Sequence, residues 1–574
     1  MRTPVIIPTG TSVFGSSKRP TVMCINLYDT ATREGLKIST RKPFRARLDA
    51  DSMSASQRKI IERLAEIVQP PPPRAPVASP ITVHAAISRF SVFYEKVRNA
   101  VDYRDDHLLR KAAIARILKR QLALEGDASA AATQLVRELI AARYLPNGVL
   151  PEDLYAQVSL VIEKYLQLHR IKAGDERHDE WLMGIVAAEI EEVVDDHTQV
   201  KGFINFLFER LAGKITVDEK DMSDTERRLQ VYIACYRSLV KADDEMIGFK
   251  LSRAYQPKWM EPETWIDNPR AMAEEMLNVE RSVRHALVHP LNAKFQSLVK
   301  PWAISLGILQ AALNENPSGA AELMEDEEAL FLAVQRIADR RMREAKGKVR
   351  RGTVRAMIYL FITKIVFALA LEIPFELVLY KHVDRFALAT NILFPPVLMF
   401  AVGSMIRMPG KENVKRIKQC VKELLSQDGP LEKRIKVPKE RGSFGRVVFG
   451  LGYALAFLLT FGAIFSILGV FNFTWVSSLI FMFFLCIVSF FAFRLRISAQ
   501  EFIAVERPDR LTNLVVDFFS IPILRAGRWL SQTISRLNIF IFFFDFIVEA
   551  PFKIFLNVLE EWSAFMKEKK DQIQ

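Results

Sequence analysis

The sequence predicts an all-α membrane protein: a helical cytoplasmic domain, then four transmembrane helices, then amphipathic helices at the membrane surface. Three observations support this prediction. Four long apolar runs lie between Val354 and Phe493, and a helix needs roughly 20 mostly apolar residues to cross hydrocarbon. Before these runs, apolar residues recur every three or four positions, as in packed helices. After them, apolar and charged residues alternate as in helices that lie in the membrane interface.

Residues 1–80 are predicted to form a poorly ordered segment with one short helix, from Ser54 to Val68. The first 50 residues mix Thr, Ser, Pro, Arg and Lys without sustained periodicity. They lack a charged start followed by a long apolar core, so no signal peptide is expected. The tract QPPPPRAPVASP, from Gln69 to Pro80, is typical of a semi-rigid linker. A partner that reads polyproline is the alternative for this tract.

Residues 81–345 are predicted to form an all-α domain, since the apolar pattern is helical almost throughout. Pro151 with two following acids marks one helix start, and Ser223 with Glu226 fits a capping box. The predicted helices span Thr82 to Tyr103, His107 to Leu124, Ser129 to Tyr144, Pro151 to Leu168, Asp179 to Asp195, Val200 to Leu211, Ser223 to Val240, Asn268 to Leu287, Asn292 to Leu313 and Ser318 to Ala345.

Two groups in this domain have the residue types of metal ligands. One is an acidic cluster beside His197, for which we expect a solvated acidic face; its acids are Glu189, Glu191, Glu192, Asp195 and Asp196. The other is the pair His285 and His289, which has helical spacing but no third ligand nearby in the sequence. We therefore expect no metal or cofactor. The segment with Trp259 and Trp265 is predicted to be a packed irregular connection, with a binding loop as the alternative.

The four predicted spans are 354–380, 386–406, 447–470 and 475–493. The last three contain no ionisable residue. The first contains Lys364, Glu372 and Glu376, and a charge at mid-helix costs about 2.5 to 3.5 kcal/mol for insertion. We expect both glutamates to lie near one end of the span, where side chains reach the interface, and neighbouring spans to shelter Lys364.

A candidate polar spot within the membrane combines residues of the first two spans: Lys364, Glu372, Asn391, Pro395 and Pro396. Two consecutive prolines should interrupt the hydrogen bonds of the second helix, and a broken helix with ionisable groups is typical of a transport site. The alternative is a simple kink with interfacial glutamates. The third span has candidate helix-packing residues for internal contact or a homo-oligomer, namely Gly450, Gly452, Ala454, Ala456, Gly462 and Ser466.

The Lys and Arg residues predict the orientation, because short loops rich in them stay in the cytoplasm. The loop 407–446 is rich in both, and Arg494 and Arg496 follow the fourth span. The other connections carry only Lys381 and Arg385. We therefore expect a multi-pass protein of the cytoplasmic membrane with both termini in the cytoplasm.

The net charge of +13 is concentrated beside the predicted membrane. Ahead of the first span lie candidate contacts for anionic lipid headgroups: Arg340, Arg341, Arg343, Lys346, Lys348, Arg350 and Arg351. A pure topology signal is the alternative. No basic face with interleaved aromatic residues indicates nucleic acid binding.

Residues 494–574 are predicted to form amphipathic surface helices and a tail, with helices from Leu514 to Leu530 and from Leu537 to Met566. The run at 537–556 lies on the membrane in this interpretation, whereas a re-entrant hairpin or a fifth crossing are the alternatives.

These features favour a non-catalytic role: a membrane-anchored scaffold or regulator whose helical domain binds a protein partner. The alternative is a small oligomeric channel or transporter that uses the polar spot. An enzyme acting on lipid or envelope precursors has the least support, because no nucleophile or metal set lies near a predicted span.

Overall fold

The computed structural model describes residues 55–536 with internal gaps, and five isolated residues after 536. The gaps are 71–78, 84–104 apart from four isolated residues, 125–126, 172–175, 196, 219–221, 382–384, 407–409, 431, 437–442, 472, 500–502 and 506–510. The predictions for residues 1–50 and for the apolar run 537–566 therefore lie outside the described residues, apart from four residues of that run.

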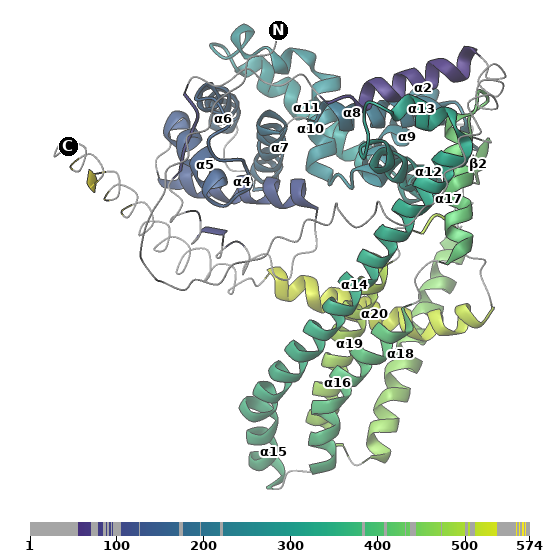
Figure 1. Cartoon of the computed structure of the whole chain (residues 1–574). Coiled ribbons are helices and arrows are strands. Elements are labelled where there is room, and N and C mark those ends of the chain that lie inside the picture. Colours follow the sequence, from purple (N-terminus) through teal and green to yellow (C-terminus); the bar gives the residue numbers. More distant parts are fainter. Residues whose placement is uncertain are drawn as a thin grey trace, which may run out of the picture. The chain divides into compact units, whose positions relative to one another are not determined.

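The described chain is built almost entirely of helices, which confirms the predicted fold class (Figure 1). The helices and strands ahead of the spans are α2 (Ala55–Val68), α4 (Asp106–Leu124), α5 (Ala128–Ala141), α6 (Asp153–Ile171), α7 (Glu176–Val194), α8 (Thr198–Ala212), β1 (Ile215–Val217), α9 (Asp224–Leu239), α10 (Asp244–Tyr255), the 3-10 turns η2 (Pro257–Met260) and η3 (Pro262–Thr264), α11 (Arg270–Leu287), α12 (Asn292–Leu313) and α13 (Ala320–Glu325). Most of these bounds agree closely with the predicted helices, but α10 was not predicted, and the predicted helix from Thr82 to Tyr103 lies mostly outside the described residues. The Ser223 side chain caps α9 by accepting from Glu226 N.

Helix α12 lies at the centre of this domain. Its buried face repeats at three and four residues and packs against α9, α8 and α2. The residues of this face are each at most 2 % exposed: Phe295, Val299, Trp302, Leu306, Leu309 and Leu313. The segment with Trp259 and Trp265 is buried irregular structure, as predicted, and its two indole rings stack at 5.0 Å.

The predicted basic loop between the second and third spans contains a helix and a strand that belong to the helical domain. Helix α17 (Lys411–Leu425) buries Ile417, Val421 and Leu424 against α12. Trp302 Nε1 on α12 donates to Glu423 Oε2 at 2.8 Å. Strand β2 (Lys433–Ile435) pairs in parallel with β1, with Ile215 opposite Lys433. The core of the helical domain thus includes chain from both sides of the first two spans.

Helix α14 (Glu327–Phe367) runs without interruption from the helical domain into the first span (Figure 1). The sequence predicted two separate helices here. The predicted helix from Ser318 instead ends with α13, and α14 begins at Asp326, whose carboxylate accepts from Glu328 N and Ala329 N at 3.0 Å. A helix of 41 residues is about 60 Å long, so α14 serves both as a domain helix and as a span.

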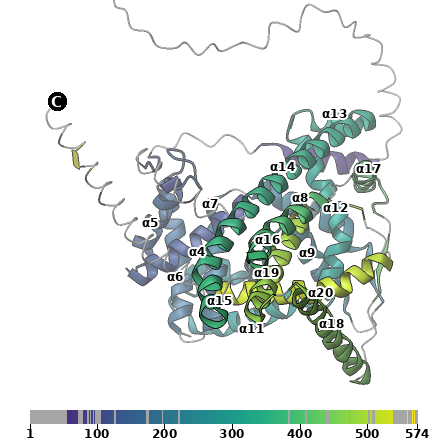
Figure 2. The same cartoon turned by 90° about the horizontal axis from the view of Figure 1, so that it is seen from below.

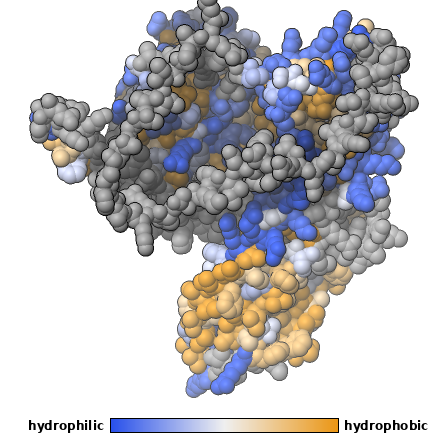
Figure 3. All heavy atoms as spheres, viewed as in Figure 1, coloured by the Kyte–Doolittle hydropathy of each residue, from blue (hydrophilic) through white to orange (hydrophobic). Residues whose placement is uncertain are grey.

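Four helical stretches are long and apolar enough to cross a membrane, which agrees with the four predicted spans. The first is completed by a π-helical segment, η4 (Ala368–Glu372), and by α15 (Ile373–Tyr380). The others are α16 (Arg385–Met405), α18 (Ser443–Val470) and α19 (Trp475–Ala499). Their joint surface is strongly hydrophobic, as Figure 3 shows in orange.

The third span, α18, is the least packed of the four. In its most apolar stretch 11 % of residues are buried, against 44 % in α19. Seen along the bundle, α18 diverges from α14, α16 and α19 (Figure 2). After the spans, α20 (Leu511–Arg536) packs across α19 and α18. Gly527 makes this crossing possible, because a Cβ there would lie 2.1 Å from the carbonyl oxygen of Cys486.

Candidate functional site

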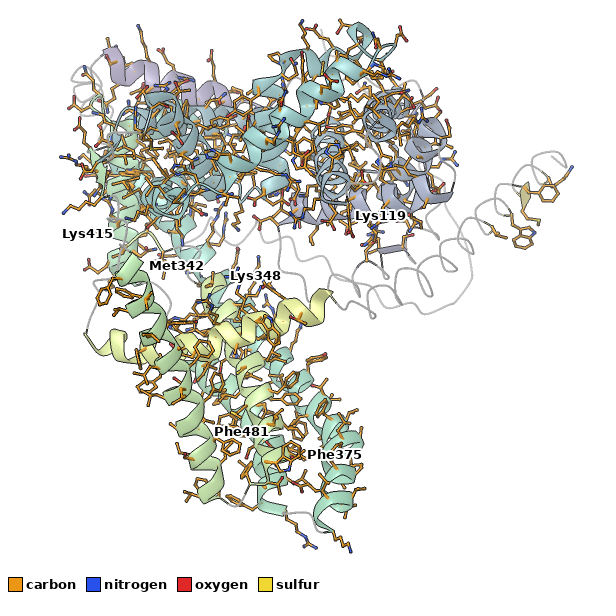
Figure 4. All side chains as sticks on the ribbon, turned by 180° about the vertical axis from the view of Figure 1, so that it is seen from behind. Lys119, Met342, Lys348, Phe375, Lys415 and Phe481 are labelled. Atoms are coloured by element: carbon orange, nitrogen blue, oxygen red, sulfur yellow. The ribbon has the colours of Figure 1, made fainter. Side chains whose placement is uncertain are left out.

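The structure brings four polar side chains together inside the membrane bundle, in what we call the polar centre: Lys364, Glu372, Asn391 and Ser477. They come from α14, η4, α16 and α19, respectively. None is more than 1 % exposed. The polar centre therefore contacts three spans and is shielded from the hydrophobic surface of the bundle; Phe375 and Phe481 in Figure 4 mark this part of the chain.

Glu372 is the hub of the polar centre. Its Oε2 atom lies 3.4 Å from Lys364 Nζ, and its Oε1 atom accepts from Ser477 Oγ at 2.9 Å and from Asn391 Nδ2. Asn391 Nδ2 also donates to Ser477 Oγ at 2.6 Å. Lys364 Nζ lies 4.4 Å from the ring centroid of Phe484, close enough for a cation–π interaction. Both charges thus have partners within the bundle.

The π-helical segment explains how Glu372 reaches Lys364. In a regular α-helix, a residue eight positions further along lies about 80° around the axis. A π-turn inserts one extra residue, which offsets about 100° and returns Glu372 to the face of Lys364. Without η4, the carboxylate would point away from the ammonium group. No pattern in the sequence predicted this π-turn.

Glu376 lies one turn beyond the polar centre and is 2 % exposed. Its Oε1 atom accepts from Thr474 Oγ1 at 3.2 Å, and Thr474 Oγ1 in turn accepts from Ser477 N at 3.1 Å. The prediction that Glu372 and Glu376 reach the interface was therefore wrong. Hydroxyl donors on α19 and in the turn before it solvate both carboxylates in place of water.

Pro395 and Pro396 are buried, but α16 continues through them, so the predicted break in this helix is wrong. Proline at 395 removes the N–H that would bond to the carbonyl of Asn391, four residues earlier. Tight packing of α16 against both α14 and α19 keeps the helix intact. No hydrogen bond or ion pair joins either proline to the polar centre among the described residues.

The candidate packing residues of α18 have few contacts within the chain. Ala456 is buried, whereas Gly450, Gly452, Ala454, Gly462 and Ser466 are exposed, and a Cβ on any of these three glycines would meet nothing within 4 Å. Internal packing is therefore the wrong interpretation for these five. The close approaches occur elsewhere: a Cβ on Gly403 of α16 would lie 2.4 Å from Thr353 of α14.

The basic residues before the first span divide into two groups. Arg340 binds Glu315 at 3.0 Å, and Arg341 is half-buried in the helical domain. The other five are exposed and have no ion-pair partner in the described part of the chain: Arg343, Lys346, Lys348, Arg350 and Arg351. Lys348 is labelled in Figure 4. All five are accessible on the surface of α14.

The acidic cluster of the helical domain is partly buried. Glu189 and Glu191 are 2 % and 1 % exposed. Glu189 Oε2 accepts from Tyr165 Oη at 2.7 Å and from Trp259 Nε1 at 3.2 Å, and its carboxylate pairs with Lys164. The prediction of a solvated acidic face was therefore wrong for Glu189 and Glu191, which Lys, Arg and Tyr side chains of neighbouring helices cover. The Asp195 side chain is 46 % exposed, and Asp196 lies outside the described residues.

Three possible metal ligands converge within this cluster, since ligand atoms of Glu191, Asp195 and His197 lie within 4.8 Å of one another. The guanidinium group of Arg110 pairs with both Glu191, at 2.7 Å, and Asp195. His197 Nε2 lies 2.9 Å from Glu191 Oε2. The acids thus already have cationic partners, and the geometry supports an ion-pair network. His285 and His289 do not share a helical face, because α11 ends at Leu287.

Burial alone would lower the pKa of His197, but the Glu191 carboxylate outweighs burial, and the net shift is upward. Asp195 also raises the pKa and Arg110 lowers it. Glu191 shows the opposite balance: burial raises its pKa, whereas His197 and Arg110 lower it, and the net shift is downward. The His197–Glu191 contact therefore links α7 to the start of α8 in a pH-dependent way.

Comparison of the sequence with protein-family models and with curated proteins, and of the structure with solved structures, gave no match.

We predict that Glu372→Gln and Lys364→Met each lower the free energy of unfolding by about 3 to 5 kcal/mol, since each leaves one buried group without its charged partner. The double variant should be less destabilised than the sum of the two single variants. Thermal unfolding of the full chain in detergent measures all four forms. Additive losses would contradict a direct Lys364–Glu372 interaction.

A second prediction concerns pH. A histidine whose pKa is raised on folding adds stability that is complete below its unfolded pKa of about 6.5 and is lost as the pH rises through the folded value. The melting temperature of the native chain should therefore fall more steeply from pH 6 to pH 8 than that of His197→Gln. His285→Gln, at an exposed position of α11, is the control and should keep the native slope. Equal slopes for all three would refute the role of His197.

Proposed function

We propose that this protein is a membrane-anchored scaffold or regulator whose helical domain faces the cytoplasm and binds a protein partner. The observation that carries the proposal is the packing of α17 and β2 into the helical domain. This packing ties the domain to the bundle through α14 and through both ends of the 407–446 segment. Such an attachment suits a domain held at the membrane surface.

The contacts of the domain also support a four-span topology. The packing of α17 on α12 supports a return of the chain to the same side after the first two spans. Ala504 N, beyond α19, donates to Asn413 Oδ1 of α17 at 2.7 Å, which supports a second return to this side after the last two spans. The excess of Lys and Arg on this side favours the cytoplasm.

Anionic lipid is the second proposed partner. The five exposed basic residues from Arg343 to Arg351 precede the start of the first predicted span at Val354 by at most about 16 Å along α14. Each basic residue near an anionic membrane surface contributes about 1 kcal/mol of attraction. Arg525 of α20 lies 4.9 Å from the ring of Tyr453 on α18, and so adds a cation close to one end of that span.

Transport is the alternative function, and one observation favours it: η4 places Glu372 inside the bundle. π-Turns within helices occur frequently at functional sites. An ionisable group within a membrane is energetically costly, so it usually has a function. The enclosure of the polar centre favours the scaffold, since Lys364, Asn391 and Ser477 occupy both carboxylate oxygens of Glu372.

The two functions are separated by one pair of measurements on the full chain. We expect chemical cross-linking in native membranes to join a partner to the helical domain, at residues between 106 and 345. We also expect Glu372→Gln to leave ion and solute flux in proteoliposomes unchanged. If no partner is cross-linked and the flux depends on Glu372, the scaffold proposal is wrong and the protein is a transporter.

A further inference from the structure

A groove lies between one face of α4 and one face of α7, and the N-terminus of α10 borders it. Its volume is about 860 Å³. The lining residues recur at helical spacing: Leu108, Lys111, Ala115 and Lys119 on α4, Glu176, Asp179, Glu180, Met183, Gly184 and Ala187 on α7, and Asp243 and Glu245 at α10. Each helix thus contributes one stripe, about 16 Å long. Lys119 is labelled in Figure 4.

Part of the lining of the groove is apolar. Ala115, Met183 and Gly184 are half-buried and supply its small or flexible surface, above the buried Leu108 and Ala187. Gly184 allows α10 to approach, because a Cβ at this position would lie 2.5 Å from Glu245 Cγ. A third helix can pack into an apolar groove between two helices through its residues at i, i+3, i+4 and i+7.

The rim of the groove is acidic in a chain whose net charge is +13. Five carboxylates and two lysines line the groove. Lys111 pairs with two of these carboxylates, since its Nζ atom lies 3.0 Å from Glu245 Oε2 and also contacts Asp243. Glu176 and Glu180 are exposed and have no ion-pair or hydrogen-bond partner among the described residues.

We infer that this groove binds a basic amphipathic helix of a protein partner, with the apolar face of that helix on Met183 and Ala115 and its Lys or Arg residues beside Glu176 and Glu180. The inference rests on the proposed scaffold function and specifies the chemistry of the partner. Charge complementarity along the rim gives specificity and speeds association, while the apolar lining supplies contact area.

The test uses the full chain in nanodiscs of zwitterionic lipid. The probes are two fluorescein-labelled amphipathic helices of about 18 residues, roughly five turns, one of Leu and Lys and the other of Leu and Glu in the same pattern. Fluorescence anisotropy should show binding of the Lys peptide. The variant Glu176→Lys/Glu180→Lys should weaken this binding at least tenfold and should gain affinity for the Glu peptide. Empty nanodiscs give the background.

The matched control is Glu263→Lys/Glu274→Lys, which makes the same charge change at two exposed positions outside the groove. It should bind the Lys peptide as the native chain does. Equal binding by native chain and groove variant, at unchanged melting temperature, would overturn the inference, as would equal loss in the control. A cellular partner cross-linked to another face of the domain would also overturn it while leaving the scaffold proposal intact.

Discussion

The ion pair between Lys364 and Glu372 is the constraint on which the membrane bundle depends. A charge in a low-dielectric interior is costly unless it is paired and hydrogen-bonded. Here both charges are fully buried, and the partners come from α14, α16 and α19. Both charges belong to the first span, and Glu372 also accepts hydrogen bonds from Asn391 on α16 and Ser477 on α19. Rotation of α16 or α19 would break these bonds, so the buried carboxylate fixes the rotation of the three spans relative to one another, which apolar packing alone would leave free.

Helix α14 connects Lys364 directly to the helical domain. Its first turns bury Leu330, Val334 and Ile337 in the domain, and the same uninterrupted helix carries Lys364 seven turns later. A continuous helix transmits rotation and translation along its length. The position of Lys364 in the bundle is thus coupled to the seating of α14 on α12 and α17.

The sequence predicted local features well, because helices and spans depend on residues close along the chain. Ser223 caps its helix as expected, and the charge-free runs of α16, α18 and α19 match their predicted spans closely. The burial of Glu376 was not predictable in the same way. It depends on Thr474, which is 98 residues away. Ser477 was likewise missed; a hydroxyl in a Phe-rich span was its only signal.

Long-range packing also explains the other errors. The basic composition of 407–446 indicated a cytoplasmic loop and no packed element, but its apolar residues recur at helical spacing and pack on a helix that lies before the first span. The glycines of α18 have the spacing of a packed interface, yet their surroundings are open because α20 covers a different face. Spacing predicts which face is available, whereas the partner that occupies it depends on the whole fold.

The central claim is that the helical domain and the 407–446 segment lie on one side of the membrane and the two short connections lie on the other. Single cysteines at Asp384, Asn472 and Asp428, in a chain without its four native cysteines, test it with a thiol reagent that does not cross membranes. The account predicts that positions 384 and 472 react from the outside of intact cells and that position 428 reacts only after permeabilisation. Reaction of position 428 together with position 384 would place α17 on the wrong side for its contact with α12 and would contradict the account.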